Sequence, residues 1–143
     1  MGPIARADSR TAVVDRMLAL LDTAHARGCD LVVFPELALT TFFPRWWMED
    51  DEVETFFERE MPSPVTQPLF DEARKRGIGF YLGYAELAEE NQSTPHYTAS
   101  ILVDKSGSIV GKYRKCHLPG HADHKTDWPY QHLEKKYFDV GFK

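Results

Sequence analysis

Two charged side chains occupy positions where chemistry could take place. Glu36 directly follows the apolar run LVVFP, which is typical of a buried strand, and α/β sheets commonly place their active sites at the carboxyl ends of strands. The aromatic side chains of residues 42–47 would shield this carboxylate from water, as suits a general base. A surface glutamate at a strand–loop junction is the alternative interpretation of the same position.

Lys115 is the second candidate, at the end of a strand predicted over residues 108–115. A lysine at a strand end can stabilise the oxyanion that develops in a transition state. Lys112 and Arg114 lie close by in the same run, so the alternative is a charged edge strand that discourages aggregation. The residue types leave both interpretations open.

The motifs that contain Glu36 and Lys115 favour the functional interpretation of both residues. The runs VVFPELALTTFFPRW and GKYRKCHLPG resemble the first two signatures of the nitrilase superfamily of carbon–nitrogen hydrolases, in the same order. Within that superfamily the chain is most similar to N-carbamoyl-D-amino-acid amidohydrolases, through ELALTTFFPRW, ILVDKSGSIVGKYRK, HLPGH and QHLEKKYF. The resemblance implies Glu36 as the general base, Lys115 as the transition-state stabiliser and Glu134 as a supporting glutamate that orients the lysine. It also implies that His117 and His132 support the substrate pocket.

The reaction implied by the resemblance is hydrolysis of an N-carbamoyl-D-amino acid to the D-amino acid, carbon dioxide and ammonia. It uses a Glu-Lys-Cys mechanism, with no cofactor and no metal. The family's third signature, which holds the nucleophilic Cys, is expected beyond residue 143, and a first strand is expected before Gly2. Residues 1–143 are therefore interpreted as a truncated domain. Cys29 and Cys116 are predicted to be packed, inert thiols.

Two other functions stay open. One is a different amidase or ureidopropionase of the same superfamily, and the other is a non-catalytic interaction protein that keeps half of the fold. A zinc site at His117, His121 and His124 is not predicted, because Pro119 and Gly120 prevent a regular presentation of these rings. No Cys pair or His-Glu-x-x-His pattern accompanies them.

Composition narrows the class of partner. The net charge of −5 argues against a nucleic-acid binder, and no apolar run approaches the roughly 20 residues of a membrane span. With only two cysteines and no apolar signal core at the N-terminus, a cytoplasmic location is the default. The expected partner is a small N-carbamoyl amino acid. A homo-oligomer is also expected, because half of a sandwich leaves apolar surface exposed.

The elements that must position these residues alternate in type. The periodicity predicts helices over residues 9–27, 52–58 and 65–76, and strands over residues 30–35, 78–87, 97–103 and 108–115. The first strand is expected to be buried on both faces. The order indicates an α/β fold whose mixed sheet has a parallel start and a meandering continuation. Together with the resemblance, this predicts part of a nitrilase-type α-β-β-α sandwich.

Overall fold

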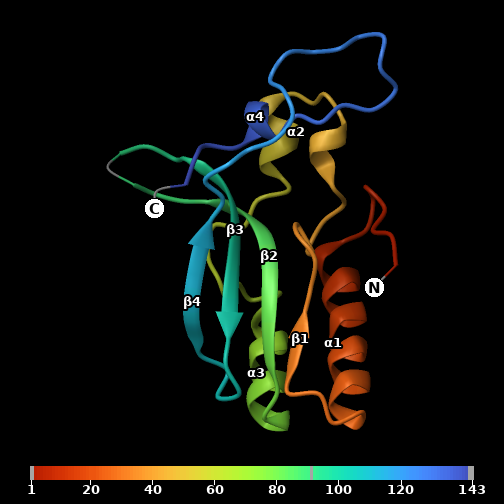
Figure 1. Cartoon of the computed structure of the whole chain (residues 1–143), viewed down its shortest axis with the longest axis vertical. Coiled ribbons are helices and arrows are strands. Elements are labelled where there is room, and N and C mark those ends of the chain that lie inside the picture. Colours follow the sequence, from red (N-terminus) through yellow and green to blue (C-terminus); the bar gives the residue numbers. More distant parts are fainter. Residues whose placement is uncertain (1, 91, 142–143) are drawn as a thin grey trace.

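One mixed sheet forms the centre of the protein in the computed structural model, which describes residues 2–90 and 92–141 (Figure 1). Its strands follow the order β1-β2-β3-β4. The strands are β1 (Leu31–Val33), β2 (Gly79–Leu87), β3 (His96–Val103) and β4 (Ile109–Arg114). The helices are α1 (Arg10–Ala26), α2 (Asp50–Glu54), α3 (Gln67–Arg76) and α4 (Glu134–Tyr137), with a 3-10 helix η1 (Phe43–Arg45).

The strand pairing confirms the predicted mixed sheet. β1 runs parallel to β2, with Leu31 opposite Gly79. The remaining pairs, β2 with β3 and β3 with β4, are antiparallel. β1, β2 and β4 therefore all point the same way, and their carboxyl ends lie at one edge of the sheet. This edge is where Glu36 and Lys115 follow their strands.

Helices α1 and α3 cover one face of the sheet and build the main core with it (Figure 1). Ser9 caps α1, because its Oγ accepts a hydrogen bond from the Ala12 N–H at 3.2 Å. Gly77 ends α3 in the left-handed region, with φ of 64°. Met17 of α1 and Phe80 of β2 are among the fully buried members of this core. Both helices thus form and end where the sequence predicts.

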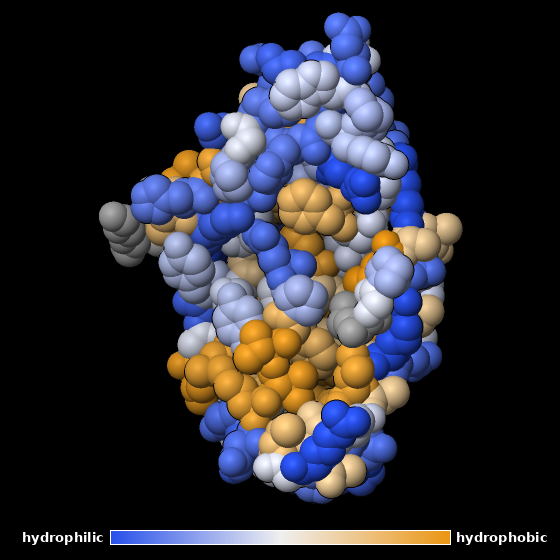
Figure 2. Space-filling model, turned by 45° about the vertical axis from the view of Figure 1, so that its right-hand side comes forward, coloured by the Kyte–Doolittle hydropathy of each residue, from blue (hydrophilic) through white to orange (hydrophobic). Residues whose placement is uncertain are grey.

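The opposite face of the sheet is open, and the prediction that β1 is buried on both faces is wrong. Leu31 is 47% exposed and Val33 is 68% exposed. Leu102 and Val110 are exposed as well, and Figure 2 shows hydrophobic side chains gathered over the strands in the lower part of the view. The reason is that, among the described residues, no second layer packs on this face. An apolar run indicates a strand, but it cannot show how many faces are covered.

A second, aromatic cluster lies at the end of the sheet where α2, η1 and α4 meet (Figure 1). Phe43 is fully buried there and stacks on Phe56, with ring centroids 4.9 Å apart. The Tyr137 hydroxyl donates to the Trp46 carbonyl and accepts from the Met48 N–H, both at 2.8 Å. The predicted acidic helix over residues 52–58 is shorter than expected, because Phe56 turns into this cluster. No helix in the described ranges is both long enough and apolar enough to cross a membrane.

Candidate active site

Glu36 begins a turn that crosses from β1 over the neighbouring strand. The Ala38 N–H donates to the Gly83 carbonyl at 2.8 Å, and Leu37 adopts a left-handed φ of 49°, which is rare for a bulky residue. A Cβ at Gly83 would lie 2.9 Å from the Glu36 Cα. Because Gly83 has no side chain, the backbone of Glu36 can rest directly on β2.

This crossing is needed because β1 and β4 are the two edge strands of the sheet, with β2 and β3 between them. At the usual spacing between strands, β1 and β4 are roughly 14 Å apart. Lys115 lies one residue past β4, and its N–H donates to the Thr98 carbonyl at 2.9 Å. Its side chain then reaches back across the face, and Nζ donates to Glu36 Oε1 at 2.9 Å. Glu36 and Lys115 are therefore within hydrogen-bond reach of each other.

Glu134 completes a three-residue arrangement from the first turn of α4. Its side chain is 2% exposed, and Oε2 accepts from Lys115 Nζ at 2.7 Å. The other oxygen, Oε1, lies 3.0 Å from Nε2 of His132. A buried carboxylate is costly unless it is paired and hydrogen-bonded, and here both oxygens have partners. Lys115 is therefore held between a buried glutamate and Glu36.

The two carboxylates determine the charge state of Lys115. Burial by itself would lower the pKa of this ammonium, but the hydrogen bonds to Glu134 and Glu36 outweigh burial, and the pKa is raised above its ordinary value. Lys115 is therefore positively charged at neutral pH. A donor that is charged at neutral pH and is held between two carboxylates can stabilise a developing negative charge.

The expected aromatic shielding of Glu36 is not observed. The Glu36 side chain is 42% exposed, and Phe43 lies in the aromatic cluster rather than beside the carboxylate. Trp47 stacks on His124, with ring centroids 4.6 Å apart. Phe42 is the aromatic residue of this segment that reaches the arrangement, through an edge contact of 5.8 Å with the His132 ring. The open sheet face explains the exposure of Glu36, because within the described residues nothing packs above it.

The two predicted histidines differ in their placement. His132 contacts Glu134, as described above. His117 is exposed, and within the described residues it forms no hydrogen bond with Glu36, Lys115 or Glu134, so its part in the pocket stays a prediction.

The cysteines also differ from each other. Cys29 is exposed, so the prediction that it is packed is wrong, because it follows the end of α1 in a surface turn. Cys116 is half-buried, with Sγ 3.6 Å from the Arg114 carbonyl. In the described part of the chain, no group of three or more His, Cys, Asp or Glu side chains is arranged to hold a metal ion.

A cavity of about 240 Å³ lies beside the charged residues on the open face. Its lining includes Glu36, Tyr81, Thr98, Ser100, Tyr113 and Lys115. Thr98 and Ser100 were not predicted as site residues, since nothing in their local pattern distinguishes them from other strand residues. The alternation along β3 would have placed both on one face, but the pattern cannot show that this face carries the site.

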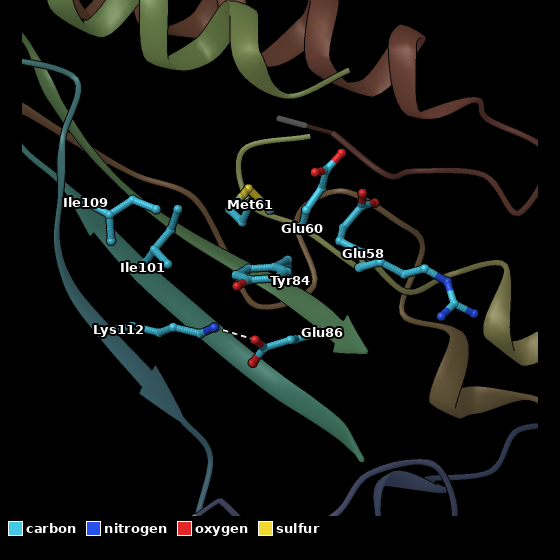
Figure 3. A pocket seen from close by; sticks show the side chains of 9 residues that line it. Glu58, Glu60, Met61, Tyr84, Glu86, Ile101, Ile109 and Lys112 are labelled. Atoms are coloured by element: carbon cyan, nitrogen blue, oxygen red, sulfur yellow. Dashed lines mark hydrogen bonds and ion pairs between the residues drawn. The ribbon is translucent and has the colours of Figure 1, made fainter. Parts of the chain in front are cut away.

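A second cavity, of about 220 Å³, lies on the helix side of the sheet (Figure 3). Its lining includes Glu58, Tyr84, Glu86 and Lys112. Figure 3 shows the Lys112 ammonium directed at the Glu86 carboxylate, and these two groups form an ion pair. Glu58 pairs with Arg10 at 2.6 Å. Both acids have cationic partners, as Glu36 does, but among the described residues this cavity is not lined by a buried side-chain oxygen that lacks a partner, whereas the cavity beside Glu36 is.

The likeness to known proteins agrees with the geometry. The sequence profile of the family described as carbon–nitrogen hydrolase matches residues 2–142. The chain is 31% identical to an N-carbamoylputrescine amidase from Arabidopsis thaliana over 131 residues, covering 87% of this chain and 38% of the relative. It is 27% identical to an aliphatic nitrilase from Rhodococcus rhodochrous, covering 77% of this chain and 31% of that protein.

Solved structures show the same fold. A carbon–nitrogen hydrolase from Helicobacter pylori G27 superposes with a TM-score of 0.73 at 24% identity, covering 98% of this chain and 43% of that one. An amidase from Nesterenkonia sp. gives a TM-score of 0.65 at 20% identity, covering 100% of this chain and 47% of that one. The chain thus spans less than half the length of these relatives. The profile match over nearly all of its residues shows that the chain belongs to the carbon–nitrogen hydrolase family.

Proposed function

We propose that this chain supplies the glutamate–lysine part of the active site of an enzyme that hydrolyses N-carbamoyl-D-amino acids to D-amino acids, carbon dioxide and ammonia. The observation that carries the proposal is the position of Lys115, whose ammonium is held between Glu36 and the buried Glu134 beside a cavity. The nucleophile is a cysteine that we place in the portion of the relatives that this chain does not span.

Glu36 acts as the general base in this proposal, which its position at the cavity supports although the expected shielding is not observed. Its carboxylate borders the cavity, so a thiol and a substrate can reach it. Glu36 takes the thiol proton as the sulfur attacks the carbamoyl carbon, and it returns that proton to the departing amine. The carbamoyl thioester remains. Water, losing its proton to Glu36, then attacks the same carbon and releases the thiol and carbamic acid, which breaks down to carbon dioxide and ammonia.

Lys115 stabilises the oxyanion in both attacks. Its raised pKa keeps it protonated, and an ammonium fixed before the reaction needs little reorganisation as negative charge develops. Glu134 is the positioning residue in this scheme. It is buried and hydrogen-bonded to both Lys115 and His132, so it fixes the lysine side chain without bordering the cavity.

The choice of substrate rests on two likenesses. The motifs of the sequence resemble N-carbamoyl-D-amino-acid amidohydrolases, and a relative at 31% identity is an N-carbamoylputrescine amidase. The substrates in both names carry an N-carbamoyl head group. The rival substrate is another amide or a nitrile. The likeness to an aliphatic nitrilase favours the nitrile.

Ammonia release tests the proposal. N-carbamoyl-D-phenylalanine, its L-enantiomer, N-carbamoylputrescine and propionitrile are offered to the 143-residue chain and to a version extended through the expected cysteine. We expect turnover of the D-compound only by the extended protein, and loss of that turnover in Glu36→Gln and Lys115→Ala. Activity of the short chain that disappears in Cys116→Ser would contradict the proposed nucleophile. Turnover of the nitrile or of N-carbamoylputrescine alone would contradict the proposed substrate.

The open sheet face supports a homo-oligomer as part of the same proposal. Leu31, Val33 and Leu102 are exposed together on strands of one sheet, and an apolar area of this kind usually marks an interaction surface. We expect light scattering to show assemblies larger than one chain. A monodisperse monomer would contradict this part of the proposal.

A further inference from the structure

The Thr98 hydroxyl is unusual among the polar groups of the protein. Thr98 is 6% exposed, and in the described part of the chain its Oγ1 is the buried side-chain oxygen that has no hydrogen-bond partner. Buried hydroxyl groups are normally hydrogen-bonded, because losing water without gaining a partner costs free energy. The group therefore needs a partner from outside the described residues.

The position of Thr98 indicates where this partner lies. Thr98 is on β3 opposite Ala85, and its carbonyl accepts the hydrogen bond from the Lys115 N–H. Thr98 is among the residues that line the same cavity as Glu36 and Lys115. The missing partner is therefore best supplied by a molecule that occupies the cavity beside the charged residues.

A purely structural role does not explain a threonine at this position. Valine has nearly the same shape and carries no hydroxyl, so it would fill the same space without an unpaired polar atom. A hydroxyl differs from valine in that it can both donate and accept a hydrogen bond. The advantage of threonine here is chemical recognition rather than packing.

We infer that Thr98 contacts the substrate and that its Oγ1 accepts a hydrogen bond from an N–H of the amide or carbamoyl head group. The inference rests on the proposed function. The Lys115 ammonium is a donor only, so it suits the carbonyl oxygen of that head group but not the adjacent N–H. Glu36 already accepts from Lys115 and, in the proposed function, takes the thiol proton, so Thr98 supplies a further acceptor for the N–H. A nitrile has no N–H, so this contact favours amides and carbamoyl compounds over nitriles.

Binding to the 143-residue chain tests the inference without requiring turnover. Dissociation constants for propionamide and for propionitrile, which differ in the head group, are measured by NMR titration. Thr98→Val removes the hydroxyl, Thr98→Ser keeps it, and Thr23→Val removes a hydroxyl on α1, where Oγ1 donates to the Ala19 carbonyl. We expect Thr98→Val to weaken propionamide binding by about three- to tenfold, the range of one neutral hydrogen bond. Propionitrile binding should not change.

The remaining arms separate recognition from structure. Thr98→Ser should bind propionamide within about twofold of the unaltered chain, and Thr23→Val should leave binding unchanged. The thermal midpoint of Thr98→Val should equal or exceed that of the unaltered chain, because an unpaired buried hydroxyl has been removed. A lower midpoint together with weaker binding of both ligands would show a structural role and overturn the inference.

A final variant distinguishes failure of the inference from failure of the proposed function. If Lys115→Ala weakens propionamide binding and Thr98→Val does not, the role of Thr98 is overturned and the proposed function stands. If neither variant changes the affinity, or if the folded unaltered chain binds no propionamide, both are overturned.

Discussion

Two carboxylate–cation clusters lie on opposite faces of the same sheet and are built in different ways. The first, called the catalytic cluster after its proposed role, consists of Glu36, Lys115 and Glu134 on the open face. The structural cluster, on the helix-covered side, is defined by Glu86, Lys112, Arg114 and Glu90. β4 supplies Lys112 and Arg114 to the structural cluster, and Lys115 follows directly after its end. Adjacent residues of the chain therefore serve the two clusters.

The structural cluster is closed. Glu86 is buried, and its Oε2 accepts from Arg114 Nε at 2.7 Å while Oε1 accepts from Lys112 and from Arg114 Nη2. Arg114 also binds Glu90 and lies over the Tyr97 ring, 4.2 Å from its centroid. Two cations meet two carboxylates, and both oxygens of Glu86 are used.

The catalytic cluster is open. One ammonium serves two carboxylates, and the Glu36 side chain is 42% exposed. Beside it lies a cavity whose lining includes Thr98, and the Thr98 hydroxyl has no partner among the described residues. The comparison shows what separates stabilising charges from reactive ones in this protein. Where every hydrogen-bonding group has a partner within the chain, the cluster stabilises the fold. Where partners are missing, the cluster can act on another molecule.

The largest expected effect separates the two clusters by the same substitution in each. In the version of the chain extended through the expected cysteine, Lys115→Met should lower kcat by at least about 100-fold, because the oxyanion loses its charged donor. Lys112→Met should leave kcat within about twofold, because Lys112 lies on the other face of the sheet. Steady-state ammonia release measures both. Equal losses in the two variants would remove the functional distinction.

The next effect concerns the free energy of unfolding, and here a substitution in the structural cluster has the larger effect. Arg114→Met leaves Glu86 buried with only Lys112 as a partner, and we expect a loss of about 3 kcal/mol in the free energy of unfolding. Arg74→Met removes an exposed arginine of α3 and should cost less than about 0.5 kcal/mol. Urea unfolding measures both variants. A loss below about 1 kcal/mol for Arg114→Met would show that the structural cluster contributes little.

A smaller effect tests how the catalytic cluster is positioned. Gly83→Ala places a Cβ 2.9 Å from the Glu36 Cα, so the turn must shift, at a cost of about 1–3 kcal/mol. The control is Gly111→Ala on β4, where the nearest heavy atom to the new Cβ is the Leu102 Cβ at 3.8 Å. NMR of the Lys115 ammonium should show its bond to Glu36 disturbed in the first variant only. An unchanged spectrum for Gly83→Ala would contradict the positioning role.

The smallest effect is a difference in pH dependence. Burial would raise the pKa of Glu86, but the hydrogen bonds from Arg114 and Lys112 outweigh burial, and the pKa is lowered from its ordinary value of 4.5. The stability that Glu86 contributes is therefore present above pH 4.5 and is lost as the pH falls through the lowered pKa. Lys115 behaves in the opposite sense. Its raised pKa gives a contribution that is present below its ordinary value of 10.5 and is lost as the pH rises through the raised value.

Urea unfolding across pH measures this difference. Glu86→Gln should flatten the decline in stability on the acid side, and Lys115→Met should flatten the decline on the alkaline side. Each variant should leave the other limb as it is in the unaltered chain. If either variant flattened both limbs, the two clusters would not be independent.

Most of the elements and the family could be predicted from the sequence alone. The spacing of apolar residues predicted α1, α3 and the order of the four strands, because helix and strand periodicity depend on residues that are neighbours in the chain. Gly77 ended α3 for a local reason, its left-handed backbone. Glu36, Lys115 and Glu134 were identified from motifs, and the structure brings these three together.

The arrangement of the surroundings of these residues could not be predicted from the sequence, because it depends on tertiary contacts. Glu36 and Lys115 are 79 positions apart, and their contact depends on the turn crossing at Gly83. The exposure of β1, the burial of Phe43 in the aromatic cluster and the unpaired Thr98 hydroxyl likewise depend on what packs against each residue from distant parts of the chain. Local periodicity reports which side of an element is apolar, but it carries no information about what covers that side. For this reason the motifs predicted Glu36, Lys115 and Glu134 as site residues, whereas the open face and the position of the Thr98 hydroxyl emerged only from the fold.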